Sequence, residues 1–308
     1  MRLIFAGTPA TAVPVLASLA EHHDVRAVLT RPPAARGRSS RLVPSDVEQW
    51  ARERQIEVLA PESLKDPECV ARIREIAPDC CPVVAYGGLI TRDLLEIPPH
   101  GWVNLHYSLL PAYRGAAPVQ RAVLDGRTRT GVTTFRIVPA LDAGPIYRQL
   151  ETDIGPSETA GDLLSRLSLL GARAMVDTLA AISGGEQPRE QDADGATQAP
   201  KVTSRDARLD MGAPAAEIVN RVRAMSPEPG AWAMLGQERF KILRAALVPD
   251  PGADPGTVAG DLTATKKKLF CRARDGWIEL IEVQAMGKRA MSGADWARGA
   301  WHPGARLD

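Results

Sequence analysis

Asn104 and His106 are the residues of this chain whose types and spacing first suggest chemistry. They lie in WVNLH at 102–106, an apolar segment that predicts a short strand, so both side chains would face the same side. An amide can donate to a carbonyl oxygen that becomes negative on attack, and an imidazole can carry a proton near neutral pH. The pair therefore predicts a site for attack on a carbonyl. An isolated Asn-x-His is nevertheless more often a buried histidine beside a structural asparagine.

Asp142 is the third candidate for this site. It lies in VPALDAGPIY at 138–147, a loop with glycine and proline between two strand-like segments. A carboxylate close to His106 would favour the imidazolium and raise the pKa of His106 above its ordinary value of ~6.5. The common alternative for such a loop residue is a solvated turn aspartate.

Several other chemistries lack their motifs in this sequence. The turn after the first strand, AGTPATA at 6–12, has no G-x-G-x-x-G, so dinucleotide binding is disfavoured. The sequence contains no P-loop and no G-x-S-x-G nucleophile elbow. Its five histidines and four cysteines show no metal-ligand spacing, which predicts a protein without a metal and with reduced cysteines in the cytoplasm.

Composition fits an ordinary soluble protein. The 308 residues are 44% hydrophobic, carry a net charge of +1, and contain no apolar run of the roughly 18 residues that a membrane span needs. Nucleic-acid binding would therefore depend on local basic patches. Gly7, Thr8 and Pro9 interrupt the apolar start of the chain, which favours a strand followed by a helix over a leader peptide.

The order of the expected elements predicts an α/β fold: a Rossmann-like, mainly parallel sheet domain followed by a small OB-like β-barrel domain. The first part alternates helical periodicity at 44–55, 66–77 and 158–183 with strand-like segments, namely RLIFAG (2–7), DVRAVLT (24–30), CCPVVAYG (80–87), WVNLH (102–106), GVTTFRIV (131–138) and PIYRQLE (145–151). Ligands of such sheets bind at the carboxyl ends of the strands. We expect Thr8 to cap the helix after the first strand, with Pro9 in its first turn.

The second part begins after a linker. SGGEQPREQDADGATQAPK at 183–201 breaks every period, and a helix is expected at about 213–225. Five strand-like runs then suit a small barrel, namely AWAMLG (231–236), RFKILRAALV (239–248), GTVAG (256–260), KKLFCRA (267–273) and WIELIEVQ (277–284). We place the sheet domain at 1–188, the linker at 189–206 and the barrel domain at 207–308.

The motifs around the candidate trio resemble those of the folate-dependent formyltransferases. Asn104-x-His106 is followed by SLLPAYRG (108–115) and later by LDAGPI (141–146). Further segments narrow the resemblance to the methionyl-tRNA formyltransferases, namely AGTP (6–9), VVAYG (83–87), RGAAPVQ (114–120), GVT (131–133), APK (199–201), SPEPGAW (226–232) and GKRAM (287–291). The likeness runs from residue 3 to about 298. It implies transfer of the formyl group of 10-formyltetrahydrofolate to the α-amino group of methionyl initiator tRNA.

The resemblance also implies roles for individual residues. Asn104 and protonated His106 would hold the oxyanion, and Asp142 would keep His106 charged. Two segments of the first domain would bind the folate cosubstrate: Ser108, Leu109, Leu110 and Pro111, and Val84, Ala85, Tyr86 and Gly87. Basic residues would contact the tRNA acceptor arm, namely Arg31, Arg36, Arg38, Arg41, Lys201, Lys266, Lys267, Lys268 and Arg289. Solvated surface charge is the alternative explanation for the arginine loop and the three lysines.

Three positions depart from the family pattern. Ala10 and Thr11 stand where the family usually has an acidic residue and then phenylalanine, and Met211 stands where it usually has tryptophan. We expect these departures to affect substrate affinity and not activity itself. Formyl transfer to a UDP-amino sugar, and a non-catalytic relative that binds tRNA or folate, are the two alternative functions. A monomer is expected.

Overall fold

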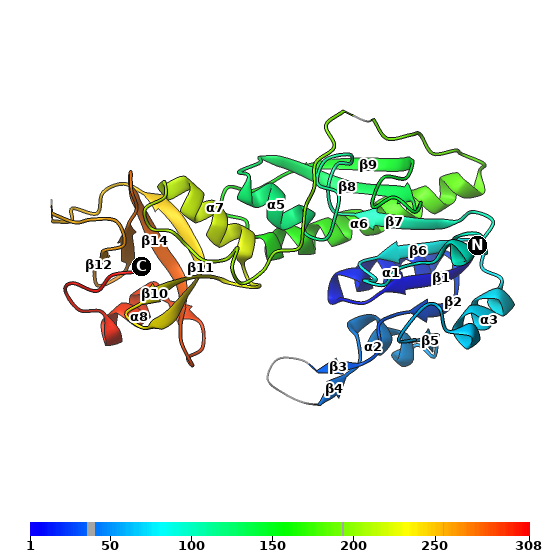
Figure 1. Ribbon diagram of the computed structural model, residues 1–308, viewed down its shortest axis with the longest axis horizontal. Helices are drawn as coiled ribbons and strands as arrows, with labels where there is room; N and C mark the ends of the chain where they lie inside the picture. The colour runs from blue at the N-terminus through cyan, green and yellow to red at the C-terminus, as the bar shows by residue number, and fades with distance from the viewer. Residues whose placement is uncertain (36–40, 193, 255) are drawn as a thin grey trace. The chain divides into compact units, whose positions relative to one another are not determined.

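The computed structural model describes residues 1–35, 41–192, 194–254 and 256–308. These residues form two compact units, each assembled from three segments of the chain (Figure 1). The first unit comprises Met1–Gly115, Thr130–Thr152 and Leu164–Gln198, and the second comprises Ala116–Arg129, Asp153–Leu163 and Ala199–Asp308. The predicted domains are continuous segments with limits at 188 and 207, whereas each compact unit combines segments that are separate in the sequence. The predicted limits therefore stay a prediction.

A seven-stranded sheet in the order β5-β2-β1-β6-β7-β8-β9 organises the first unit. Its strands are β1 (Arg2–Gly7), β2 (Asp24–Leu29), β5 (Glu57–Leu59), β6 (Cys81–Val84), β7 (Trp102–His106), β8 (Arg129–Arg136) and β9 (Ile146–Asp153). The pairs from β5 through to β7 are all parallel, and β7 pairs with β8 antiparallel. The expected mainly parallel, Rossmann-like sheet is therefore confirmed.

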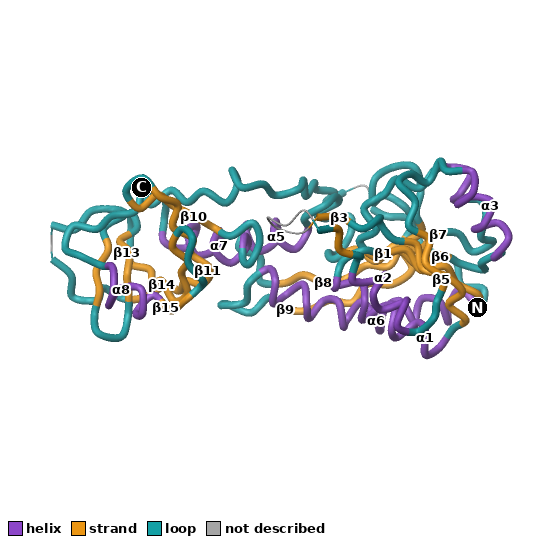
Figure 2. Tube along the Cα trace, turned by 90° about the horizontal axis from the view of Figure 1, so that it is seen from below, coloured by secondary structure: helices purple, strands orange, loops and turns teal. Residues whose placement is uncertain are grey.

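Helices cover both faces of this sheet, which explains why its central strands β1 and β6 are almost continuously apolar. Figure 2 shows α3 (Pro67–Ile76) on one side and α1 (Val13–His22) and α6 (Ala160–Ser183) on the other. On the α3 side, alternate residues of the strands such as Ile4 and Val83 form a buried cluster with Ile73 of the helix. The first unit also holds α2 (Asp46–Glu53) and the short α4 (Arg92–Leu95). The predicted helices at 44–55, 66–77 and 158–183 are confirmed to within two residues at each end.

The turn after β1 differs from its prediction. A 3₁₀ turn, η1 (Ala10–Ala12), follows Pro9, and the N-cap of α1 is Ala12 without a side-chain hydrogen bond. The Thr8 hydroxyl instead donates to the Tyr86 carbonyl at 2.8 Å. The prediction that Thr8 caps the helix is wrong, because its hydroxyl ties the end of β1 to the segment after β6.

The second unit contains an antiparallel sheet in the order β10-β11-β14-β13-β12, with β15 paired to β14. The strands are β10 (Ala231–Leu235), β11 (Glu238–Val248), β12 (Leu262–Ala264), β13 (Leu269–Arg272), β14 (Trp277–Ala285) and β15 (Met291–Ser292). Residues 306–307 join the two edges of the sheet, since Leu307 bridges to Leu235 at the end of β10 and Arg306 bridges to Asp261 beside β12. The sheet is thereby closed in the manner of a small barrel. The unit also holds α5 (Pro118–Leu124), α7 (Ala215–Met225) and α8 (Gly293–Ala300).

One of the five predicted strands of this unit is wrong. GTVAG at 256–260 is a turn region, and the strand found near this position is β12 at Leu262–Ala264. Gly260 has a φ of +94°, and Asp261 accepts a hydrogen bond from the Val258 amide at 2.8 Å, so the backbone folds back before β12 begins. The helices α5 and α8 have no counterpart among the predicted elements.

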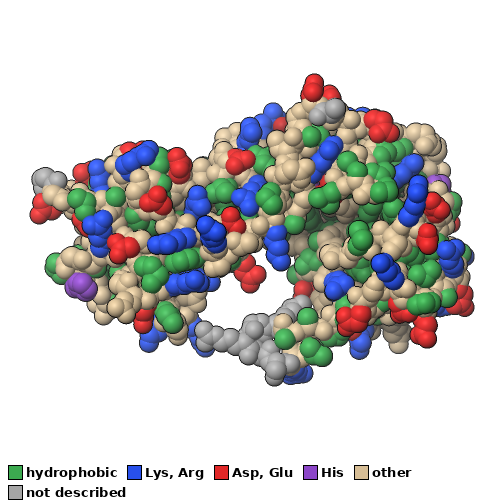
Figure 3. All heavy atoms as spheres, in the orientation of Figure 1, with side chains coloured by type: hydrophobic (Ala, Val, Ile, Leu, Met, Phe, Trp, Pro, Cys, Tyr) green, Lys and Arg blue, Asp and Glu red, His purple; other side chains and the backbone are tan. Residues whose placement is uncertain are grey.

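Three general properties follow from the structure. Among the residues that the structure describes, no helix has the length and apolar character needed to cross a membrane. The four cysteines are buried and free. On the face shown in Figure 3, basic and acidic side chains are intermixed.

Candidate active site

His106 is the last residue of β7 and is 5% exposed. Its Nε2 lies 2.8 Å from the carbonyl oxygen of Tyr113, in the loop that follows the strand. A carbonyl only accepts hydrogen bonds, so Nε2 carries the ring proton and Nδ1 is the nitrogen left to gain one. The ring also meets Phe135 of β8 edge to face. The strand and its loop therefore fix both the place and the tautomer of the imidazole.

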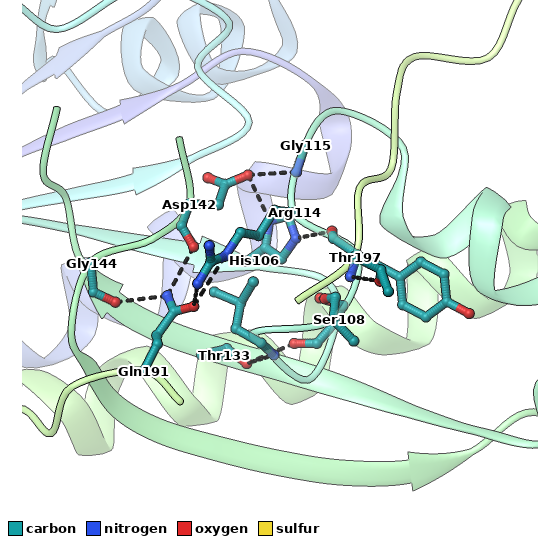
Figure 4. A network of polar contacts seen from close by, with 12 residues as sticks. His106, Ser108, Arg114, Gly115, Thr133, Asp142, Gly144, Gln191 and Thr197 are labelled. Carbon is teal, nitrogen blue, oxygen red and sulfur yellow. Dashed lines mark hydrogen bonds and ion pairs between the residues drawn. The ribbon is translucent and has the colours of Figure 1, made fainter. Parts of the chain in front are cut away.

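The fold brings Asp142 to the other side of the same ring. Its Oδ2 lies 3.8 Å from His106 Nδ1 and accepts a hydrogen bond from the Gly115 amide at 2.7 Å (Figure 4). Asp142 has a φ of +48°, a left-handed conformation that is uncommon for a residue with a side chain. Such a conformation persists only where neighbouring contacts hold it, which is frequent at functional sites.

The pKa of His106 is lowered, not raised. Burial is the main cause because it penalises the charged imidazolium, and it outweighs the opposing effects of the Asp142 carboxylate and the Tyr113 carbonyl. The prediction that Asp142 keeps His106 protonated is therefore wrong for this structure. At 3.8 Å the carboxylate is too distant for a direct hydrogen bond, which limits how far it can offset the burial.

Asn104 occupies the middle of β7, two residues before His106, opposite Val83 of β6 and Phe135 of β8. Residues two apart in a strand face the same side, so the amide projects from the face that carries the imidazole. Among the described residues, the half-buried side chain of Asn104 has no hydrogen-bond partner. Its amide donor is thus available to a ligand.

The segment 108–111 is held mainly through its backbone. The buried hydroxyl of Thr133 donates to the Ser108 carbonyl at 2.7 Å and accepts from the Leu110 amide at 3.1 Å. The side-chain amide of Gln149 donates to the Leu110 carbonyl at 2.7 Å, and the Ser108 hydroxyl donates to the Ala112 carbonyl at 2.6 Å. The loop therefore has a fixed course beside His106, with Leu109 and Pro111 partly exposed along it.

The segment 84–87 leaves β6 through two left-handed residues, Ala85 at φ +47° and Gly87 at φ +77°. Tyr86 lines a solvent-open cavity of about 180 Å³ together with Arg31, Lys65 and other residues. Burial raises the pKa of Tyr86 to about 12. This cavity brings a residue predicted to bind cosubstrate beside one predicted to bind tRNA, which the sequence did not suggest.

The other predicted tRNA residues are dispersed. Arg36 and Arg38 lie outside the described residues, while Arg41 is exposed next to β4 (Leu42–Val43), which pairs with β3 (Ala34–Ala35). Lys266 and Lys267 are exposed in the turn between β12 and β13, whereas Lys268 is paired with Glu279 at 2.7 Å. Lys201 and Arg289 are exposed. Within the described part of the chain, no cluster of three or more His, Cys, Asp or Glu side chains could hold a metal ion.

Sequence reasoning identified a linker but not its contacts with the candidate site. Residues 189–192 and 194–198 of this segment belong to the first unit, where Arg189 bridges to Ile146 of β9 and Gln198 bridges to Arg114. Figure 4 shows Gln191 and Thr197 of this segment, which we call the strap, among the residues around His106. Only its lack of periodicity was visible in the sequence, and that pattern carries no information about long-range contacts.

Comparison with known proteins places this site in a family. A model described as "Formyl transferase" matches residues 1–179, and one described as "Formyl transferase, C-terminal domain" matches residues 201–300. A methionyl-tRNA formyltransferase from Thermobifida fusca is 51% identical over 302 residues, which cover 97% of this chain and 96% of that protein. The chain belongs to the methionyl-tRNA formyltransferase family. It is accordingly a formyl-transferring enzyme, as the motifs predicted.

Solved structures of formyltransferases share the fold. A methionyl-tRNA formyltransferase from Clostridium thermocellum aligns with a TM-score of 0.56 at 15% identity, covering 85% of this chain and 97% of that one. An N-formyltransferase from Helicobacter canadensis, solved with folinic acid and dTDP-3-aminofucose, aligns with a TM-score of 0.67 at 18% identity, covering 92% of this chain and 98% of that one. At these identities the likeness shows the common fold.

Proposed function

We propose that this chain transfers the formyl group of 10-formyltetrahydrofolate to the α-amino group of methionyl initiator tRNA. The observation that carries the proposal is the His106–Asp142 pair, which the chain assembles from the end of β7 and a loop distant in sequence, on the strand that also carries Asn104, whose amide has no partner among the described residues. A relative at 51% identity over nearly the full chain supplies the acceptor, methionyl-tRNA. Folate is supported as the donor by the folinic acid bound in the related N-formyltransferase.

The geometry supports a division of labour among the three residues. The free amine of the acceptor attacks the formyl carbon, a carbon–nitrogen bond forms, and the carbonyl electrons move to the oxygen. The Asn104 amide donates to this oxyanion. His106 accepts the proton of the attacking nitrogen at Nδ1, since Nε2 already holds one, and the Asp142 carboxylate stabilises the resulting imidazolium. When the bond to the donor nitrogen breaks, the imidazolium returns the proton to that nitrogen.

This scheme changes the role first expected for His106. To hold the oxyanion, a protonated His106 would have to release the Tyr113 carbonyl or turn away from Asp142. The lowered pKa of His106 favours the neutral ring, the form in which Nδ1 can accept a proton.

The remaining assignments belong to the same proposal. Segments 84–87 and 108–111 bind the folate, and Arg31, Arg36, Arg38 and Arg41 with Lys201, Lys266, Lys267, Lys268 and Arg289 contact the acceptor arm. The enzyme works in the cytoplasm as a monomer without a metal. Its catalytic domain covers 1–188, its linker 189–206 and its barrel domain 207–308.

The test offers purified protein 10-formyltetrahydrofolate with methionyl initiator tRNA, with uncharged tRNA, and with a UDP-amino sugar. Formylation of the charged tRNA alone supports the proposal, and turnover of the sugar alone would redirect it to a sugar acceptor. His106→Ala should lower the rate of transfer by about 10²–10⁴-fold, the usual contribution of a positioned base, while tRNA affinity is retained. A near-normal rate in this variant would contradict the mechanism.

A further inference from the structure

We propose that Gln191 of the strap is a positioning residue that holds the Asp142 loop against the loop that follows β7. The proposal rests on the function proposed above and adds to it a residue outside the Asn104, His106 and Asp142 trio. Gln191 lies in the segment that the sequence marks only as a linker.

The side-chain amide of Gln191 is fully engaged between the two loops (Figure 4). Its Nε2 donates to the carbonyls of Asp142 at 2.8 Å and Gly144 at 2.7 Å. Its Oε1 accepts from two nitrogens of the Arg114 guanidinium, Nη2 at 2.6 Å and Nε at 3.2 Å. One amide therefore joins the loop that carries the catalytic carboxylate to the loop whose Gly115 amide binds that carboxylate.

The chemistry of the partners fixes the orientation of this amide. Carbonyl oxygens only accept and a guanidinium only donates, so the nitrogen of Gln191 must face Asp142 and Gly144 and its oxygen must face Arg114. No side chain other than an amide supplies two donors and an acceptor at this reach, and glutamate would place an oxygen against two carbonyl oxygens. The site thus selects glutamine by hydrogen-bond polarity and not only by size.

The contacts act on the part of the Asp142 loop that needs support. Asp142 is held at φ +48°, and a Cβ added to Gly144 would overlap the Arg136 carbonyl, so the turn packs too closely to be rebuilt by small shifts. Gln191 binds the backbone on both sides of Ala143 in this turn. Removing it frees two carbonyls and lets the carboxylate move relative to His106 Nδ1.

The strap supports the opposite side of the imidazole as well. Thr197 Oγ1 accepts a hydrogen bond from the Tyr113 amide at 2.8 Å, and the Thr197 carbonyl accepts from the Arg114 amide at 2.8 Å. The Tyr113 carbonyl in turn accepts from His106 Nε2. Both groups that flank the His106 ring are therefore tied to residues of the strap.

The test compares Gln191→Ala and Gln191→Glu with Gln187→Ala, an exposed glutamine just before the strap, whose amide donates to the nearby Gly185 carbonyl and has no other hydrogen bond within the described residues. Gln191→Glu keeps an acceptor for Arg114 and removes the donor for Asp142 and Gly144. It therefore tests the two hydrogen bonds to the Asp142 loop separately from those to Arg114. We expect both Gln191 variants to lower kcat by about 10–100-fold with KM changed by less than about threefold, as for a small misplacement of a catalytic group. Gln187→Ala should match the wild type.

A second readout needs no substrate. The pKa of His106, followed by NMR titration of the folded protein, should fall further in Gln191→Ala, because Asp142 is the charge that opposes the effect of burial. A wild-type pKa in Gln191→Ala together with a wild-type kcat in Gln191→Glu would overturn the proposal. If the wild type fails to formylate methionyl-tRNA, the proposed function fails on its own, and the NMR titration still decides the role of Gln191.

Discussion

Replacing Thr133 with valine tests how the candidate folate loop is held. Thr133 is fully buried. Its hydroxyl donates a hydrogen bond to the Ser108 carbonyl at 2.7 Å and accepts one from the Leu110 amide at 3.1 Å. Valine keeps the shape and removes both of these hydrogen bonds, together with a longer one from Gln149 Nε2 at 3.3 Å, so two buried backbone groups lose their partner. Each such loss costs about 1–3 kcal/mol, which predicts a decrease in the free energy of unfolding of about 2–6 kcal/mol.

The decrease is measured by urea unfolding followed by tryptophan fluorescence, with Thr263→Val as the matched control. Thr263 lies half-exposed in β12, and its hydroxyl has no hydrogen bond within the described residues, so its replacement should stay within about 0.5 kcal/mol of the wild type. Because the loop 108–111 is loosened in Thr133→Val, KM for the formyl donor should rise as well. A stability loss no larger than that of the control would refute the view that this hydroxyl fixes the loop.

Three further predictions concern the site and its surroundings. The rate of transfer should fall on the acid side for two reasons. Protonation of the substrate's α-amine, whose ordinary pKa is ~7.7–8.0, removes the nucleophile, and protonation of His106 below ~6.5 removes the base, because burial lowers the pKa of His106. An acid profile explained by the α-amine alone would contradict this. Arg41→Ala should reduce the slope of log KM for tRNA against log salt concentration by about 1, the contribution of one phosphate contact. Arg26 pairs with Asp24, and Arg26→Ala should leave this slope unchanged. Cys80 and Cys81 should resist thiol reagents in the folded protein at about pH 8, since burial raises the pKa of Cys80 to about 12 and that of Cys81 well above its usual value, whereas the unfolded chain should be labelled at both.

The central strands and long helices were predictable because they repeat a local pattern. β6 is a continuous apolar run, β1 is apolar after Arg2, β7 is apolar apart from Asn104 and His106, and α6 keeps helical periodicity over its 24 residues. The segment 256–260 has the composition of a short strand. Its backbone conformation, with Gly260 at φ +94°, makes it a turn, and the composition does not reveal that conformation. Local patterns therefore predicted the sheet of the first unit better than the barrel.

The candidate site was predictable in its members and not in its energetics. Residue types and motifs pointed to Asn104, His106 and Asp142, but the sign of the His106 pKa depends on burial, which a sequence does not display. Gln191 and Thr197 lie 49 and 84 residues from the groups that they hold, Asp142 and Tyr113. Contacts at such separations leave no periodic signal, so a segment without any pattern turned out to pack against the site.

The closure of the C-terminal sheet by residues 306–307 covers two strand edges that other chains could otherwise pair with. Leu307 and Arg306 occupy the backbone groups that β10 and the start of β12 would otherwise leave unpaired. A protein cut before Ala305 would present two open strand edges, and exposed edges pair readily with other chains. Fusions at this end should therefore follow Asp308 through a flexible spacer, so that the closing residues keep their place in the sheet.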